Sequence, residues 1–145
     1  MTRQALLDLA ARCEAATGAD RELNDAIASE IFTGKHRVRI AGLSDEAGGL
    51  WLFTYPNGSI GSALRFTASL DAAMSLVPEG WLWQIGAYAR GEVCAPAYYR
   101  AVLRRWVRGV DGELSWPRVS RTSATPALAL TAACLKALAQ EIEHD

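Results

Sequence analysis

The chain has 145 residues, and its 50% hydrophobic and 21% charged content is typical of one globular domain, which we assign to residues 1–145. The formal net charge of −1 argues against binding duplex nucleic acid or a membrane surface through overall charge. No apolar run reaches the ~18 residues of a membrane span. The three cysteines form neither a CxxC pair nor a Cys/His cluster, which excludes a zinc site and indicates a reducing cytoplasm.

Two helices are predicted at the N-terminus. Residues 2–17 carry apolar side chains at helical spacing, and Gly18 ends this pattern. Asp20 is suited to cap a second helix, whose apolar stripe consists of Leu23, Ile27 and Ile31.

The next part of the chain has strand and turn signals. Residues 34–49 show the weakest pattern, although they include a short basic cluster. Residues 50–55 are rich in strand-forming side chains, and Pro56-Asn57-Gly58 is a turn signal. Residues 60–66 are expected to supply a short partner strand.

A capped helix followed by an aromatic strand is predicted in the middle of the chain. Ser69 is placed to cap the helix, and Pro78 ends it. Residues 81–88 form the clearest strand pattern. Trp81, Trp83 and Ile85 share one face of this strand, which we assign to the core.

The C-terminal part predicts a hairpin and then a long helix. Asp111-Gly112 is a hairpin turn signal, and the return strand at 113–120 contains Pro117, which confines it to an edge or a bulge. Thr125 caps the last helix, which continues to about Glu141. Its predicted buried seam is Leu128, Ala132, Leu135, Ala139 and Ile142.

Together these elements predict an α/β fold of the α+β class. We expect a helix–sheet–helix sandwich with a mainly antiparallel sheet, an N-terminal helical pair and a long C-terminal helix. The connections are too short for repeated parallel crossovers.

Three segments resemble the phage ABA sandwich proteins, a family of small phage and prophage proteins. They are the tract 67–81, the helix start at 123–133, and the N-terminal pattern Leu6-Leu7-Asp8-Leu9-Ala10 followed by residues 18–23. The resemblance implies α–β–α layering and a phage or prophage origin. It implies no established enzymatic activity and supplies no catalytic residue.

Residues 98–108 carry the main candidate site, and two geometries are open for them. As a strand, one face presents Tyr98, Arg100, Val102, Arg104, Trp106 and Arg108. As a helix, the segment has an apolar stripe and an ordinary solvated arginine face. The resemblance and the following hairpin turn favour the strand.

The predicted strand face combines chemistry for a nucleotide-type ligand. Arginines bind phosphate and aromatic rings stack on bases. Seven arginines but only three acids lie between Arg90 and Arg121. The predicted ligand-binding residues are Tyr98, Arg100, Arg104, Trp106, Arg108 and Trp116.

No nucleophile triad, phosphate-binding loop or metal-ligand motif occurs, so we predict a binding protein that has no cofactor and is not an enzyme. Its expected role is phage anti-defence, by sequestering a small anionic ligand such as a host immune signal. The alternatives are an inhibitor that binds a host defence protein and an enzyme with an unrecognised site. We also expect a homo-oligomer, because a hydrophobic sheet edge invites pairing.

Overall fold

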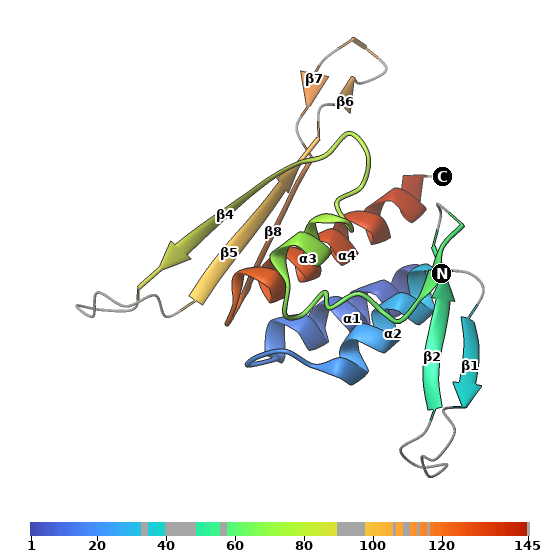
Figure 1. Cartoon of the computed structure of the whole chain (residues 1–145). Coiled ribbons are helices and arrows are strands. Elements are labelled where there is room, and N and C mark those ends of the chain that lie inside the picture. Colours follow the sequence, from blue (N-terminus) through green and yellow to red (C-terminus); the bar gives the residue numbers. More distant parts are fainter. Residues whose placement is uncertain are drawn as a thin grey trace.

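The computed structural model describes residues 1–32, 35–39, 49–55, 58–89, 98–105, 107–108, 111–112, 114–115 and 117–144. In chain order the elements are α1 (Arg3–Ala15), α2 (Arg21–Ile31), β1 (Lys35–Arg39), β2 (Gly49–Thr54), β3 (Ile60–Gly61), α3 (Leu70–Met74), β4 (Leu82–Tyr88), β5 (Tyr98–Arg104), β6 (Val107–Arg108), β7 (Leu114–Ser115), β8 (Arg118–Ser123) and α4 (Pro126–His144) (Figure 1).

The predicted caps begin three of these helices. The Asp20 carboxylate accepts a hydrogen bond from the backbone N–H three residues later at 3.0 Å. The hydroxyls of Ser69 and Thr125 do the same at 3.3 and 3.2 Å. Each cap satisfies a backbone donor that the first turn of a helix leaves unpaired.

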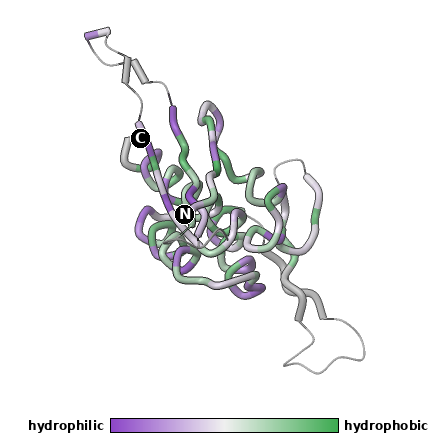
Figure 2. Tube along the Cα trace, turned by 90° about the vertical axis from the view of Figure 1, so that its left-hand side faces the viewer, coloured by the Kyte–Doolittle hydropathy of each residue, from purple (hydrophilic) through white to green (hydrophobic). Residues whose placement is uncertain are grey.

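Helix α4 is the centre of the core. It packs against α1 on one side and against β5 and β8 on the other (Figure 1). Of the predicted seam, Leu128, Ala132, Leu135 and Ala139 are buried and Ile142 is half-buried. Residues 127–135 of α4 are all buried, so this part of the helix is covered on every side. Along the rest of the trace, hydrophobic and hydrophilic stretches alternate (Figure 2).

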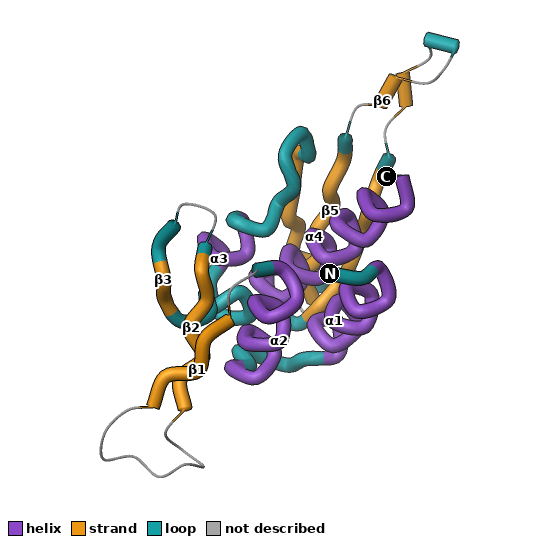
Figure 3. The backbone as a smooth tube through the Cα atoms, turned by 90° about the vertical axis from the view of Figure 1, so that its right-hand side faces the viewer, coloured by secondary structure: helices purple, strands orange, loops and turns teal. Residues whose placement is uncertain are grey.

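The described strands form three antiparallel sheets, with strand orders β1-β2-β3, β4-β5-β8 and β6-β7. The first two lie on different sides of the helices (Figure 3). The predicted α+β class is therefore confirmed, with antiparallel strands, an N-terminal helical pair and a long C-terminal helix packed on a sheet. Over the described residues, no helix has both the length and the apolar character needed to cross a lipid bilayer.

One segment without a predicted element forms a strand, and one local expectation differs from the structure. The weakly patterned residues 34–49 contain β1, whose backbone pairs with β2 from Lys35 opposite Phe53 to Arg39 opposite Gly49. Trp81 is buried as predicted, but Trp83 is 38% exposed. Trp83 lies on the helix-facing side of β4, opposite the buried Leu103. The helices cover this side only in part, because β4 is at the edge of its sheet.

Candidate functional site

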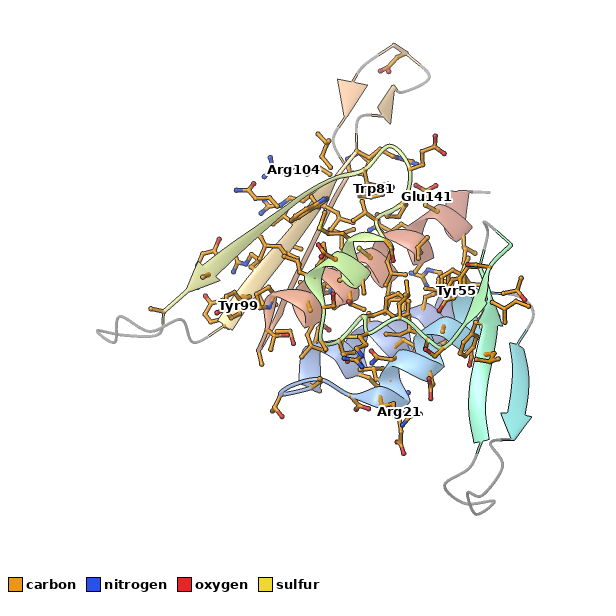
Figure 4. The ribbon with its side chains drawn as sticks, viewed as in Figure 1. Arg21, Tyr55, Trp81, Tyr99, Arg104 and Glu141 are labelled. Carbon is orange, nitrogen blue, oxygen red and sulfur yellow. The ribbon has the colours of Figure 1, made fainter. Side chains whose placement is uncertain are left out.

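The segment predicted to bind a ligand is extended over residues 98–104, so the strand interpretation is correct there and the helix interpretation is wrong. Ala101 and Leu103 are fully buried in the core that includes α4. Arg100 is half-buried and Arg104 is exposed. This alternation places the two arginines on the side of the sheet that faces away from the helices, as Figure 4 shows for Arg104.

The predicted row of residues does not continue as one strand to Arg108. The Arg105 N–H donates to the Pro117 carbonyl at 3.2 Å, but proline has no N–H with which to return the bond. Beyond this point β6 pairs with β7, so the backbone of Arg108 belongs to a separate two-stranded ribbon. Trp106 and Trp116, also predicted to bind the ligand, lie outside the described residues.

The neighbouring strands enlarge the outward side of β5. In β8, Arg118 is opposite Arg104. In β4, Tyr88 is opposite Tyr98. The helices pack on the other side of this sheet (Figure 1). We define the open sheet face by its outward residues, which are Leu82, Gln84, Gly86, Tyr88, Tyr98, Arg100, Val102, Arg104, Arg118, Ser120 and Thr122.

The open sheet face is basic and contains no acidic residue. Its arginines are Arg100, Arg104 and Arg118. None of these three forms a salt bridge with a carboxylate of the described residues. The described residues thus provide no acidic partner for these three guanidinium groups.

The arginines on the helix-facing side have structural partners instead. The Arg121 guanidinium is 3.1 Å from the Glu14 carboxylate of α1. Arg105 forms a salt bridge with Glu141 of α4. The alternation of the strands thus separates arginines that hold the helices to the sheet from arginines that face outward.

A cluster of stacked side chains lies at one end of the open sheet face. The rings of Tyr88 and Tyr98 are nearly parallel, with centroids 5.4 Å apart and an interplanar angle of 12°. The Arg100 guanidinium carbon lies 5.0 Å from the Tyr88 ring centroid. Tyr88 leans over Gly86, where a Cβ atom would come within 3.0 Å of the ring. The glycine therefore allows this packing, which holds Arg100 against an aromatic surface.

A depression of about 600 Å³ adjoins this cluster. Tyr98 and Arg100 line it together with the C-terminal end of α1 and the end of β8. The Ser123 hydroxyl donates to the Cys13 carbonyl at 2.7 Å and fixes these two elements to each other. The open sheet face therefore borders a polar hollow at the end where its tyrosines are stacked.

The sequence predicted that Tyr98, Arg100 and Arg104 share one strand face, as the structure shows, but it did not identify two further residues of the open sheet face. Arg118 falls in the predicted return strand, and Tyr88 ends the predicted aromatic strand. Both join the site through strand register, which the residue pattern alone did not provide. The alternation within each strand was the available signal.

The described cysteines offer no reactive thiol. Burial raises the pKa of Cys13 to about 12, and burial also raises the pKa of Cys134. Both thiols are protonated at neutral pH and act as small apolar core residues. Within the described part of the chain, no group of three or more histidine, cysteine or acidic side chains is placed to hold a metal ion.

No known protein family matches the chain, and no curated protein or solved structure shows significant similarity to it.

Proposed function

We propose that the protein binds and sequesters a small anionic, nucleotide-type ligand on the open sheet face, without catalysing a reaction. One observation carries this proposal. Three arginines that have no carboxylate partner among the described residues share that face with two stacked tyrosines. One arginine guanidinium can donate two parallel hydrogen bonds to a phosphate, and a base can stack on a tyrosine ring.

The spacing of the arginines favours a ligand with more than one anionic group. Arg100 and Arg104 are four residues apart on one strand, which corresponds to about 13 Å. Arg118 lies directly beside Arg104 on the next strand, so two guanidiniums can share one phosphate there. A second phosphate would reach Arg100, where the stacked tyrosines are close enough to meet a base.

The biological setting we propose is the cytoplasm of a bacterial host cell. The resemblance to phage ABA sandwich proteins supports a phage or prophage accessory role. A nucleotide-type signal of host immunity would then be the ligand, and its removal from solution would be the anti-defence activity.

Thermal unfolding with a panel of mononucleotides, linear dinucleotides and cyclic nucleotides tests the proposal. A ligand present at 100 times its dissociation constant stabilises the folded state by about 2.7 kcal/mol. Arg104→Ala and Arg118→Ala should each reduce this stabilisation. Arg21→Ala removes the same charge from an exposed position on α2, far from the open sheet face (Figure 4). This control should leave the stabilisation by the ligand unchanged. The absence of stabilisation by every nucleotide would contradict the proposal.

An inhibitor that binds a host defence protein is the second candidate. It is favoured by apolar surface beside the arginines, since Leu82 and Tyr88 of the same face are 64% and 40% exposed. Tyrosine and arginine are enriched among the residues that dominate protein interfaces. A partner captured by the unmodified chain should be lost with Arg104→Glu and Arg118→Glu and retained with Arg21→Glu. Capture that survives both outward substitutions would exclude this use of the face.

A further inference from the structure

The proposed function leaves the free edge of β4 without a role. Within the described residues, β4 pairs with β5 and with no other strand. A strand edge presents unpaired N–H and C=O groups that another strand can bind. Natural edges usually discourage this with charged residues or proline. The β4 sequence, LWQIGAY, contains neither.

Large apolar side chains beside this edge are also exposed. Leu82 and Tyr88 are 64% and 40% exposed on the open sheet face. Trp83 is 38% exposed on the opposite side of the strand. The edge therefore leaves apolar surface uncovered on both sides of its backbone, which is typical of a surface that another chain covers.

We infer that β4 pairs in antiparallel fashion with β4 of a second copy of this chain, about a two-fold axis at Ile85. The pairing joins two three-stranded sheets into one six-stranded sheet. The side chains that face each other are then Trp83 with Ala87, Gln84 with Gly86, and Leu82 with Tyr88. Each large residue meets a small or an apolar one, so the strand is complementary to itself in this register.

The distribution of charge indicates that two copies meet at the β4 edge and not at the open sheet face. Two open sheet faces packed together would oppose three arginines with three arginines, with no carboxylate to compensate. The β4 edge carries no charge, so two copies approach it without repulsion. The contact is isologous and closes at two copies.

The pairing completes the binding face, and this part of the inference rests on the proposed function. Within one chain, Leu82 of β4 is opposite Arg104, and Tyr88 is six residues further along β4, which corresponds to about 20 Å. Leu82 lies beside Arg104 in its own sheet and beside Tyr88 of the second copy across the new edge. Because neighbouring strands are about 4.8 Å apart, Arg104 comes within about 10 Å of that tyrosine. Each Arg104–Arg118 pair thereby gains an aromatic surface from the other copy.

Light scattering and sedimentation test the assembly directly. The unmodified chain should have twice the 15.7 kDa mass of one copy at micromolar concentration. Leu82→Lys places a charge at the edge of both copies and should raise the dimer dissociation constant about tenfold or more. Ile60→Lys is the matched control, because Ile60 is 61% exposed in a different sheet, and it should leave the dimer intact. A single-copy mass, or a dimer equally weakened by both substitutions, would overturn the inference.

Disulfide trapping tests the register. In a Cys94→Ser background, the double variant Leu82→Cys with Tyr88→Cys places thiols on directly opposite residues, about 5 Å apart at Cβ. Oxidation should link the two copies. Leu82→Cys alone leaves the two thiols about 20 Å apart and should not link them. Failure of the double variant to link, or equal linking of the single variant, would overturn the register.

The two proposals fail in different ways. A single-copy mass with retained nucleotide binding would reject the β4 pairing and leave the ligand proposal standing. A dimer that Leu82→Lys dissociates, with no stabilisation by any nucleotide, would support the pairing and reject the ligand.

Discussion

Arg104 and Arg118 lie directly opposite each other on β5 and β8, and neither forms a salt bridge with a carboxylate of the described residues. Like charges on directly opposed residues destabilise a sheet. The pair therefore opposes folding while it provides the strongest positive charge on the open sheet face. An external anion that binds both guanidiniums would relieve this repulsion, which is the role we propose for the ligand.

Removing one member of this pair should stabilise the protein and weaken its binding. We expect Arg118→Gln to raise the free energy of unfolding by about 0.5 kcal/mol, because the repulsion is lost. Urea denaturation at low ionic strength measures this gain, which should shrink as salt screens the repulsion in the unmodified chain. Arg21→Gln, which removes a charge elsewhere, should give no comparable gain. If Arg118→Gln is more stable but still binds nucleotides at full affinity, the Arg104–Arg118 pair is not part of the ligand site.

The space beneath Tyr88 is the subject of a second prediction. A Cβ atom at Gly86 would come within 3.0 Å of the ring, so Gly86→Ala should displace Tyr88 from Arg100 and Tyr98. We expect a loss of about 1 kcal/mol in the free energy of unfolding. At Gly61, a Cβ atom would make an ordinary 3.7 Å contact with Tyr55. Gly61→Ala should therefore be neutral or slightly stabilising, and equal effects of the two substitutions would contradict the packing described for Tyr88.

Glu141 joins the C-terminal helix to the sheet, which gives a third prediction. Its carboxylate accepts from the Trp81 indole N–H at 2.8 Å and pairs with Arg105. The buried Arg105 Nε has no hydrogen-bond partner within the described part of the chain. Glu141→Ala should cost about 2 kcal/mol, because it leaves two donors unpaired. Glu141→Gln retains an acceptor oxygen and should cost about half as much.

Urea unfolding followed by tryptophan fluorescence distinguishes the two Glu141 substitutions. Glu79→Ala removes an exposed carboxylate and should change stability by no more than about 0.5 kcal/mol. Equal costs for Glu141→Ala and Glu79→Ala would show that the contact with Trp81 and Arg105 does not stabilise the fold.

The buried thiols give the fourth prediction, a loss of stability in alkali. The ordinary thiol pKa is 9.0, whereas burial raises the pKa of Cys13 to about 12. Between these values the unfolded chain binds fewer protons than the native one, so the contribution of Cys13 is full below pH 9 and decreases as pH rises. The slope reaches about 1.4 kcal/mol per pH unit for each such thiol.

Comparison of urea unfolding at pH 8.5, 9.5 and 10.5, about the range in which an exposed thiol deprotonates, measures this slope. Cys13→Ala should lower stability at every pH, because it leaves a cavity, but its stability should fall less steeply with pH. The two chains differ only at residue 13, so the comparison isolates the contribution of this thiol. Identical slopes would show that burial does not raise the pKa of Cys13 above that of an exposed thiol.

Local signals were sufficient to predict most elements of the fold. A single capping side chain marks the start of each of three helices, and Asp20, Ser69 and Thr125 were all identified from the sequence. The alternation in residues 98–104 likewise predicted that Tyr98, Arg100, Val102 and Arg104 share one face of that strand. These features depend on neighbours within a few residues, which a sequence displays directly.

The features that the sequence did not predict depend on contacts between segments that are distant in the chain. The position of Arg118 opposite Arg104 follows from strand register, which packing against α4 fixes. The exposure of Trp83 follows from the position of β4 at a sheet edge, and an aromatic residue in a strand pattern does not reveal which strand is outermost. Strand β1 has a basic, weakly alternating sequence, and β2 supplies its backbone partners.

Pro117 makes the hairpin of β6 and β7 a separable attachment to the rest of the protein. Because the ladder between β5 and β8 stops at a residue without an amide hydrogen, added sequence at Asp111-Gly112 transmits no change of register to the main sheet. A fluorescent reporter or an affinity tag grafted at that turn would therefore leave the main sheet and its outward arginines unchanged.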